Sequence, residues 1–309
     1  MTLNPILAFS ARRRMRSPRT AILLTLYCLA VLVFGLGAAF STYLRPTLSL
    51  YSLGAGLEGY VLMVLFQFFL LLLVSPALTA GSISGERERQ TLELLLVTNT
   101  GSLRIVLGKL LETLGLVLLL IIATLPSLCL CLLTGAMSLP HVLLGLAYLG
   151  VTAFACLSVG MFCSTLFRRT VAATVVSYLV VFAIGLGTLL PLLRDMASMR
   201  KAYDMLYISS MPAPSAAPSV DGMTLVSFEL NPALGLLSLL AWQTGLLRST
   251  IGNYSYQLYE LYDYLDFRAM ALRCMAFMGA CGLALNLASA CLVRPRKMRV
   301  KARKTEKKA

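Results

Sequence analysis

Hydrophobic positions along the chain gather in six long stretches that polar segments separate. The stretches are 20–40, 60–80, 111–134, 142–164, 171–193 and 269–293. A helix that crosses a bilayer needs roughly 20 apolar residues, because the hydrocarbon core is about 30 Å thick. The pattern therefore predicts an all-α integral membrane protein with six transmembrane helices, which form a single transmembrane domain over residues 1–309.

The polar segments predict how this domain is oriented. The longest are a loop at 81–109, a segment at 194–268 and a basic tail at 294–309. With the N-terminus inside, the inner segments hold twenty basic residues and the short outer loops hold only Arg45. Because positively charged loops stay in the cytoplasm, we expect both termini and loop 81–109 there, and segment 194–268 outside. We thus expect a multi-pass protein of the cytoplasmic membrane.

Two shorter segments predict helices at the membrane surfaces. Segment 231–247 is apolar, and Asn231 and Pro232 suit the cap and the first position of a helix. Counting it as a seventh span would send the basic tail outside, so we expect a re-entrant or interfacial outer helix before the sixth span. At the other end, residues 4–16 predict a helix on the inner surface, which Pro18 ends.

Composition agrees with a membrane protein and argues against two other classes. With 58% hydrophobic and 13% charged residues, the chain is too apolar for a soluble domain. Its net charge of +14 would suggest nucleic acid in a soluble protein, but nine of the 27 Lys and Arg lie in the last sixteen positions. Anionic lipid headgroups attract such flanks, so we expect contact with the lipid membrane and no nucleic-acid partner. The eight cysteines lack zinc-site or redox-motif spacing and are interpreted as packing residues.

Groups that could perform catalysis are scarce. There is one histidine, His141, and no paired intramembrane carboxylate is visible. Glu112 lies near the interior of a span, and we expect it to pair with Arg104 and Lys109 at the inner interface. Segment 101–110 superficially resembles a phosphate-binding loop, but it has six residues between its glycines and a leucine in place of the magnesium-binding hydroxyl. We therefore expect no catalytic residue, no metal site, no bound cofactor and no enzymatic activity in this chain.

The loop at 81–109 combines charge with leucine. Residues 86–93 carry five charges, spaced so that Glu86 with Arg89, and Arg89 with Glu93, could pair on one helix face. Each such pair contributes only about 0.2 to 0.5 kcal/mol, which is too little to explain the segment. The apolar run at 92–97 is too short to span and must be buried elsewhere. It either packs against the inner ends of its own spans or docks in a groove of a cytoplasmic partner.

At this loop the sequence matches a known pattern. The stretch GSISGERERQTLELLLVTNTGSLRIVLGKLLE at 81–112 resembles the inner loop of the type 2 ABC transporter permease family. The matching positions are Glu86, Arg87 and Glu88, then Thr91, Leu92 and Glu93, then Leu95 and Leu96, and finally Lys109. Six spans, cytoplasmic termini, an inner surface helix and a re-entrant helix are similar to that family as well. Gln90 departs from the pattern, since a glycine is common there.

The resemblance implies a permease subunit of an ABC exporter, which moves a substrate outward across the membrane. A separate nucleotide-binding ATPase would bind and hydrolyse ATP with Mg²⁺, and a second permease subunit would complete a homodimer or a heterodimer. The loop would act as a coupling helix that transmits ATPase closure to the spans. Its residues would be Glu86, Arg87, Glu88, Arg89, Thr91, Leu92, Glu93, Leu95 and Leu96.

Two alternatives differ from an exporter in class. One is a non-transporting membrane component, such as a sensor or an assembly factor, that docks the same ATPase. The other is an intramembrane enzyme, against which the missing catalytic groups argue. The substrate-binding residues are unknown. The polar groups within spans include Gln67, Ser75, Thr124 and Ser177, but small polar residues at such positions more often serve helix packing.

Overall fold

The computed structural model describes residues 18–43, 51–91, 102–133, 137–190, 194, 226, 229–245 and 266–293. Its helices are α2 (Pro18–Tyr43), α3 (Tyr51–Ala80), α4 (Ser84–Glu88), α6 (Ser102–Ala123), α7 (Leu125–Leu133), α8 (Leu139–Leu166), α9 (Thr170–Gly187), α12 (Pro232–Thr244) and α15 (Phe267–Val293). Over these ranges the chain forms no strand. The prediction of an all-α protein is confirmed for this part of the chain.

Five helical segments are long and apolar enough to cross a membrane. They are Gly59–Glu88, Ser102–Cys129, Leu139–Leu166, Thr170–Gly187 and Phe267–Val293. The first expected span, 20–40, lies within α2, where Thr20–Gly35 is a shorter apolar helix. The chain is thus a multi-pass membrane protein. The expected surface helix at 4–16, the tail at 294–309 and most of segment 194–268 lie outside the described residues.

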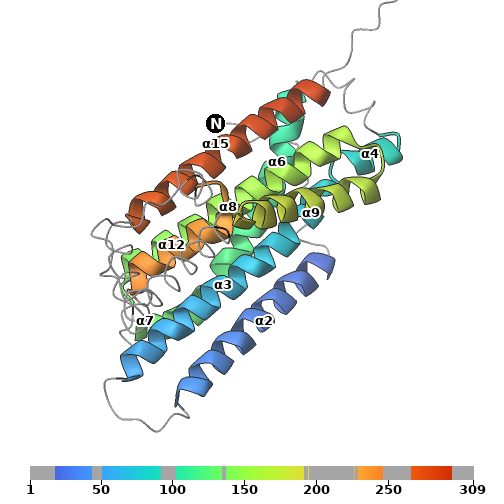
Figure 1. Cartoon of the computed structure of the whole chain (residues 1–309). Helices are drawn as coiled ribbons and strands as arrows, with labels where there is room; N and C mark the ends of the chain where they lie inside the picture. Colours follow the sequence, from blue (N-terminus) through green and yellow to red (C-terminus); the bar gives the residue numbers. More distant parts are fainter. Residues whose placement is uncertain are drawn as a thin grey trace, which may run out of the picture.

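The helices form one bundle with α8 at its centre. Helix α8 packs against α3, α6, α9 and α15, and the long helices run side by side in Figure 1. The main core includes Tyr60, Tyr148, Leu157 and Met161, which are fully buried. The short helix α4 lies at one end of the bundle and α12 at the other (Figure 1).

The third expected span, 111–134, differs from a single continuous helix. Its helix begins at Ser102, so Arg104 and Lys109 lie on the first turns of α6 and not in a loop. The helix then breaks at Thr124, and α7 continues from Leu125. The cause is Pro126, which has no N–H to donate to the carbonyl of Ile122 one turn earlier. Pro126 was the available sequence signal for this break.

Helix α12 begins as the sequence predicts. The side chain of Asn231 accepts hydrogen bonds from the backbone N–H groups of Ala233 and Leu234, and Pro232 occupies the first turn. The helix ends at Gly245, which has φ of +62°. Glycine tolerates this left-handed conformation because it has no Cβ. The predicted cap of this helix is therefore confirmed.

Side chains hold α12 against the spans. The Tyr148 hydroxyl of α8 donates to the Pro232 carbonyl over 2.7 Å, and Asn231 Nδ2 donates to the Gly185 carbonyl of α9 over 2.9 Å. At the other end of α12, Gln243 donates to the carbonyl of His141. Because these bonds satisfy polar groups beside apolar helices, α12 is part of the bundle and not a detached segment.

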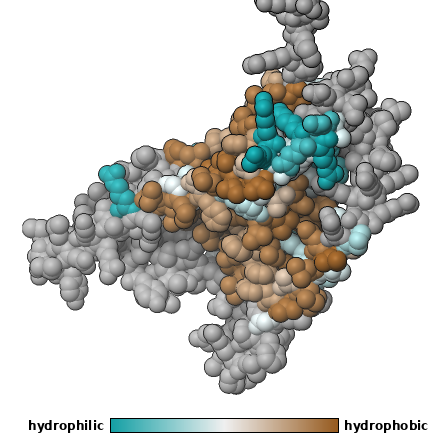
Figure 2. Space-filling model, turned by 90° about the vertical axis from the view of Figure 1, so that its right-hand side faces the viewer, coloured by the Kyte–Doolittle hydropathy of each residue, from teal (hydrophilic) through white to brown (hydrophobic). Residues whose placement is uncertain are grey.

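Helix α2 contacts the bundle through a separate small core. Its residues Tyr27 and Val31 are buried with Leu120 of α6, and Phe34 stacks on Phe66 of α3 at a centroid distance of 4.3 Å. The surface around the helices is broadly apolar. Figure 2 faces the side of the bundle on which α4 lies and shows a large hydrophilic group beside that apolar surface, with smaller hydrophilic patches elsewhere. A broadly apolar surface is typical of a protein that spans a bilayer.

Candidate functional site at one end of the bundle

The short helix α4 begins with help from another helix. Its N-cap position is Ile83, whose side chain has no oxygen and makes no capping bond. The hydroxyl of Ser164, in the last turn of α8, instead accepts from the backbone N–H groups of Ile83 and Ser84, over 2.9 and 3.0 Å. Free N–H groups at a helix start need such acceptors. Ser164 therefore fixes the start of α4 to the end of α8.

Helix α4 ends in a paired hydrogen-bond motif. The N–H of Thr91 donates to the Glu86 carbonyl over 3.0 Å, and the N–H of Gln90 donates to the Arg87 carbonyl over 3.1 Å. Both bonds require a left-handed residue just after the helix, and Gln90 has φ of +59°. In the family pattern that the loop resembles, glycine is common at this position. The left-handed backbone of Gln90 explains that preference.

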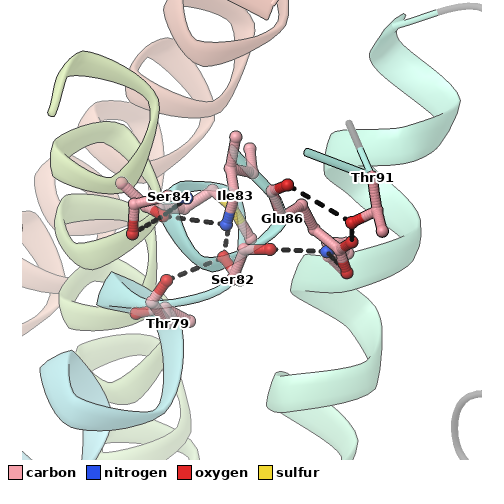
Figure 3. A network of polar contacts seen from close by, with 9 residues as sticks. Thr79, Ser82, Ile83, Ser84, Glu86 and Thr91 are labelled. Atoms are coloured by element: carbon pink, nitrogen blue, oxygen red, sulfur yellow. Dashed lines mark hydrogen bonds and ion pairs between the residues drawn. The ribbon is translucent and has the colours of Figure 1, made fainter. Parts of the chain in front are cut away.

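The carboxylate of Glu86 lies at the centre of a polar network (Figure 3). Lys109 Nζ, on α6, is 2.9 Å from Glu86 Oε1 and also donates to the carbonyl of Ser82. The hydroxyl of Thr91 donates to Glu86 Oε2 and to the Glu86 carbonyl. The Glu86 and Lys109 side chains are partly buried, so water screens their attraction only in part. The network joins both ends of α4 to α6.

A second carboxylate of α4 points to a different helix. Glu88 Oε1 accepts from the backbone N–H of Thr170 over 2.9 Å, and Glu88 Oε2 accepts from the Thr170 hydroxyl over 3.0 Å. Thr170 is the first residue of α9. Negative charge is favourable at a helix N-terminus, where backbone N–H groups lack partners. Glu88 thus caps a helix that begins 82 positions later in the chain.

Together these contacts join α4 to three helices besides α3, which leads into it. Ser164 comes from α8, Lys109 from α6 and Thr170 from α9. A displacement of α4 therefore strains contacts with each of these helices. This short element is therefore fixed to the ends of several helices at once.

Comparison with known proteins identifies the family of this chain. The sequence pattern described as "ABC-2 family transporter protein" matches residues 40–242, which is more than half of the chain. The chain belongs to the ABC-2 transporter family. It is therefore an ABC-type permease subunit, which associates with the membrane and with an ABC ATPase partner. No curated protein matches the sequence.

Four of the residues expected from the sequence take part in the contacts of this permease site. Glu86, Glu88, Thr91 and Lys109 take part in the contacts above. Arg87 is partly buried and Arg89 is exposed. The remaining expected residues of the loop, Leu92, Glu93, Leu95 and Leu96, lie outside the described residues.

Lys109 has a partner that the sequence did not suggest. The sequence predicts that Lys109 and Arg104 pair with Glu112, because all three lie within about two turns of α6. In the structure Lys109 binds the Glu86 carboxylate, 23 positions earlier. The turn at 81–83 brings α4 back beside α6, which sequence spacing alone does not reveal. Arg104 is exposed on α6 and Glu112 is partly buried.

Ser164 and Thr170 were missed by sequence reasoning. Each is a common residue at the end of an apolar stretch, and neither carries a charge that would attract attention. A serine in the last turn of one span and a threonine at the start of the next were the only signals. Their partners lie 80 and 82 positions away, so only the fold identifies them.

Polar groups within the permease spans mostly bind neighbouring helices or their own backbone. Gln67 Nε2 donates to the Thr124 hydroxyl over 2.8 Å, at the break between α6 and α7. The hydroxyl of Ser177 donates to the Ala173 carbonyl one turn earlier. Among the described residues, no cluster of three or more His, Cys, Asp or Glu could hold a metal ion.

Proposed function

We propose that this permease exports a substrate outward across the cytoplasmic membrane, using ATP that a separate nucleotide-binding subunit hydrolyses. The observation that carries the proposal is the attachment of α4 to α6, α8 and α9 at one end of the bundle. In this proposal the chain itself has no catalytic centre and binds no cofactor. ATP and Mg²⁺ belong to the partner, and α4 with the residues that follow it is the coupling element.

The coupling element needs contacts that differ between two states of the transporter. A nucleotide shifts a conformational equilibrium only as far as its binding distinguishes the states. In the proposal, the ATPase binds the side of α4 that faces away from the bundle, around Arg87 and Arg89. It also binds the leucines at 92–96. The carboxylates of Glu86 and Glu88 face the bundle instead and hold the element in place.

We further propose six spans with both termini in the cytoplasm. Helix α2 has 26 residues, which corresponds to a length of roughly 39 Å and suffices for a hydrocarbon core of about 30 Å. The polar end with α4 would then face the cytoplasm and α12 the outside. A cysteine placed at Arg89 should react with a membrane-impermeant maleimide only in inverted vesicles, and one at Ser138 only in intact cells. The reverse labelling would overturn this orientation.

A second permease subunit completes the proposed transporter. Helix α9 offers one face for it, because it leaves a row of large apolar side chains uncovered, including Val171, Val175, Leu179 and Phe182. Lipid or a second subunit, either identical or related, would cover them. Cross-linking of the purified complex in lipid nanodiscs should yield a permease dimer, whereas a monomer bound to one ATPase would refute this part.

The direct test is recovery of the ATPase with the tagged permease. We expect Glu86→Ala and Leu95→Asp to reduce ATPase co-purification or transport while membrane insertion is retained. The matched control is Glu229→Ala, which removes an outer-end carboxylate that pairs with Arg273. Normal complex formation and normal transport in both loop variants would overturn the coupling assignment.

A further inference from the structure

Helix α9 begins without a cap of its own. The residue before it, Arg169, has an extended backbone and makes no side-chain capping bond. Glu88 provides the cap from α4, with one carboxylate oxygen on the Thr170 N–H and the other on its hydroxyl. Both interactions involve a charged acceptor, and hydrogen bonds of this kind are stronger than those between neutral groups. The first turn of α9 therefore depends on the position of α4.

The same threonine also packs against the turn that leads into α4. A Cβ at Gly85 would lie 3.5 Å from the Thr170 methyl group, and a Cβ at Gly81 would lie 3.9 Å from it. These are ordinary van der Waals distances, so a Cβ at either position would fit beside the methyl group. Thr170 is thus held by Glu88 on its polar side and lies beside the turn on its apolar side.

A second bond joins α9 to α3 two turns further along. The hydroxyl of Tyr178 donates to the backbone carbonyl of Leu73. Leu73 lies three positions before Pro76, whose missing N–H would have served the carbonyl of the preceding residue, Leu72. Helix α9 is therefore attached to the unit formed by α3 and α4 at two points, Thr170 and Tyr178, in addition to its packing on α8.

The outer face of α9 carries no comparable restraint in the described residues. Its exposed side chains are Val171, Val175, Leu179, Phe182, Ile184 and Leu186, all of which are apolar. Such a face slides against lipid or another apolar helix without breaking hydrogen bonds. The contacts that restrain α9 thus lie on the side that faces α3, α4 and α8. Its first turn therefore moves with α4.

We infer that Glu88 is a positioning residue which transmits the movement of α4 to α9 through its contact with Thr170. This inference rests on the proposed function, in which the ATPase displaces α4. Lys109 and Glu86 join the same element to α6, so one displacement reaches two spans at once. Glu88 is exposed, but both of its carboxylate oxygens bind Thr170, so the inference assigns it to holding a span of its own subunit and not to docking the ATPase.

The test measures the movement of α9 directly. Spin labels at Leu103→Cys on α6 and Leu179→Cys on α9, both exposed positions, report the separation of the two helices in the full chain in lipid nanodiscs. The distance is recorded with the ATPase that co-purifies, with and without a non-hydrolysable ATP analogue. The variants are Glu88→Ala and Thr170→Val, with Glu229→Ala as the matched loss of a carboxylate at the other end.

We expect the analogue to shift the Leu103–Leu179 distance in the unsubstituted chain and in Glu229→Ala. In Glu88→Ala the ATPase should still co-purify, but the shift should be lost, and Thr170→Val should reduce it. Glu88→Gln should restore the shift, because its amide can accept from the Thr170 N–H and donate to the hydroxyl. A merely structural cap would leave the shift unchanged. A shift of full size in Glu88→Ala therefore overturns the inference.

A failure of the proposed function gives a different result. If no ATPase co-purifies with the unsubstituted chain, the proposed function fails, and the contact is judged by hydrogen exchange at the first turn of α9. Loss of a helix cap should then raise the exchange rate of the Thr170 amide by about tenfold in Glu88→Ala. An unchanged rate would overturn the inference on its own.

Discussion

Lys109 on α6 and Glu86 on α4 form an ion pair of 2.9 Å although 23 positions separate them in the sequence. The pair is partly buried, and Lys109 also donates to the carbonyl of Ser82. Lysine entering a span can extend its ammonium toward the polar end of the bundle. Here that ammonium closes the turn between α3 and α4 and anchors it to α6.

Removing one partner of this pair should lower the free energy of unfolding more than removing both partners. We expect Lys109→Met to lower the free energy of unfolding by about 1 to 2 kcal/mol, because Glu86 keeps its charge and loses a charged donor. The double variant Glu86→Gln/Lys109→Met should recover part of this loss. Unfolding in mixed micelles with a denaturing detergent measures the stability of the unsubstituted chain, the single variants and the double variant, which together form a double-mutant cycle. The pair of exposed Arg273 with partly buried Glu229 is the control, and Arg273→Met should cost less than about 1 kcal/mol. Additive losses would contradict a direct interaction.

Gln90 should be improved by glycine. Its φ of +59° is unfavourable for a residue with a Cβ, by about 1 kcal/mol. We expect Gln90→Gly to slow hydrogen exchange at the Gln90 and Thr91 amides, which close the end of α4. Gln90→Val should speed it, since a β-branched side chain fits this conformation poorly. Equal exchange in both variants would mean that the local conformation is not as described.

The break between α6 and α7 should depend on the bond from Gln67 to Thr124. Thr124→Val leaves the buried amide of Gln67 without that acceptor, and we expect a loss of about 1 kcal/mol in the free energy of unfolding. Adding Gln67→Leu should restore much of the stability, because the unpaired polar group is then removed as well. If the double variant is less stable than Thr124→Val alone, the amide has another role at this break.

Gly235 should be required for the close packing of α12 against its neighbouring helices. A Cβ at this position would lie 2.9 Å from the Cys274 Cβ and would also overlap the Cys274 sulfur and the Tyr148 hydroxyl. We expect Gly235→Ala to displace α12, at a cost of about 1 to 3 kcal/mol, and to make the buried Cys274 react faster with a small thiol reagent. Leu237→Ala, at an exposed position of the same helix, is the control. Unchanged thiol reactivity in Gly235→Ala would show that the helix has room to adjust.

Local patterns determined the elements of this protein. Apolar stretches of about 20 residues predicted the membrane helices, because length and hydrophobicity are properties of each segment by itself. Asn231 and Pro232 predicted the start of α12 for the same reason, since a cap involves only its neighbours in the chain. The charged loop beside the second span was visible as the unusual feature, and its motif led to the family that comparison confirmed.

Tertiary structure decided what the loop residues touch. The sequence showed only that Glu86 could pair with Arg89 along one helix, whereas the carboxylates of the five-residue helix α4 reach Lys109 and Thr170. These partners are 23 and 82 positions away, and no periodic pattern encodes such distances. The left-handed conformation of Gln90 likewise depends on tertiary structure. It ends α4 and turns the chain so that the Thr91 hydroxyl reaches the Glu86 carboxylate. The sequence by itself determined which segments are long and apolar enough to cross a membrane, because length and hydrophobicity belong to each segment alone. Only the packed bundle decided which polar groups hold the loop, because a hydrogen bond needs both partners in place.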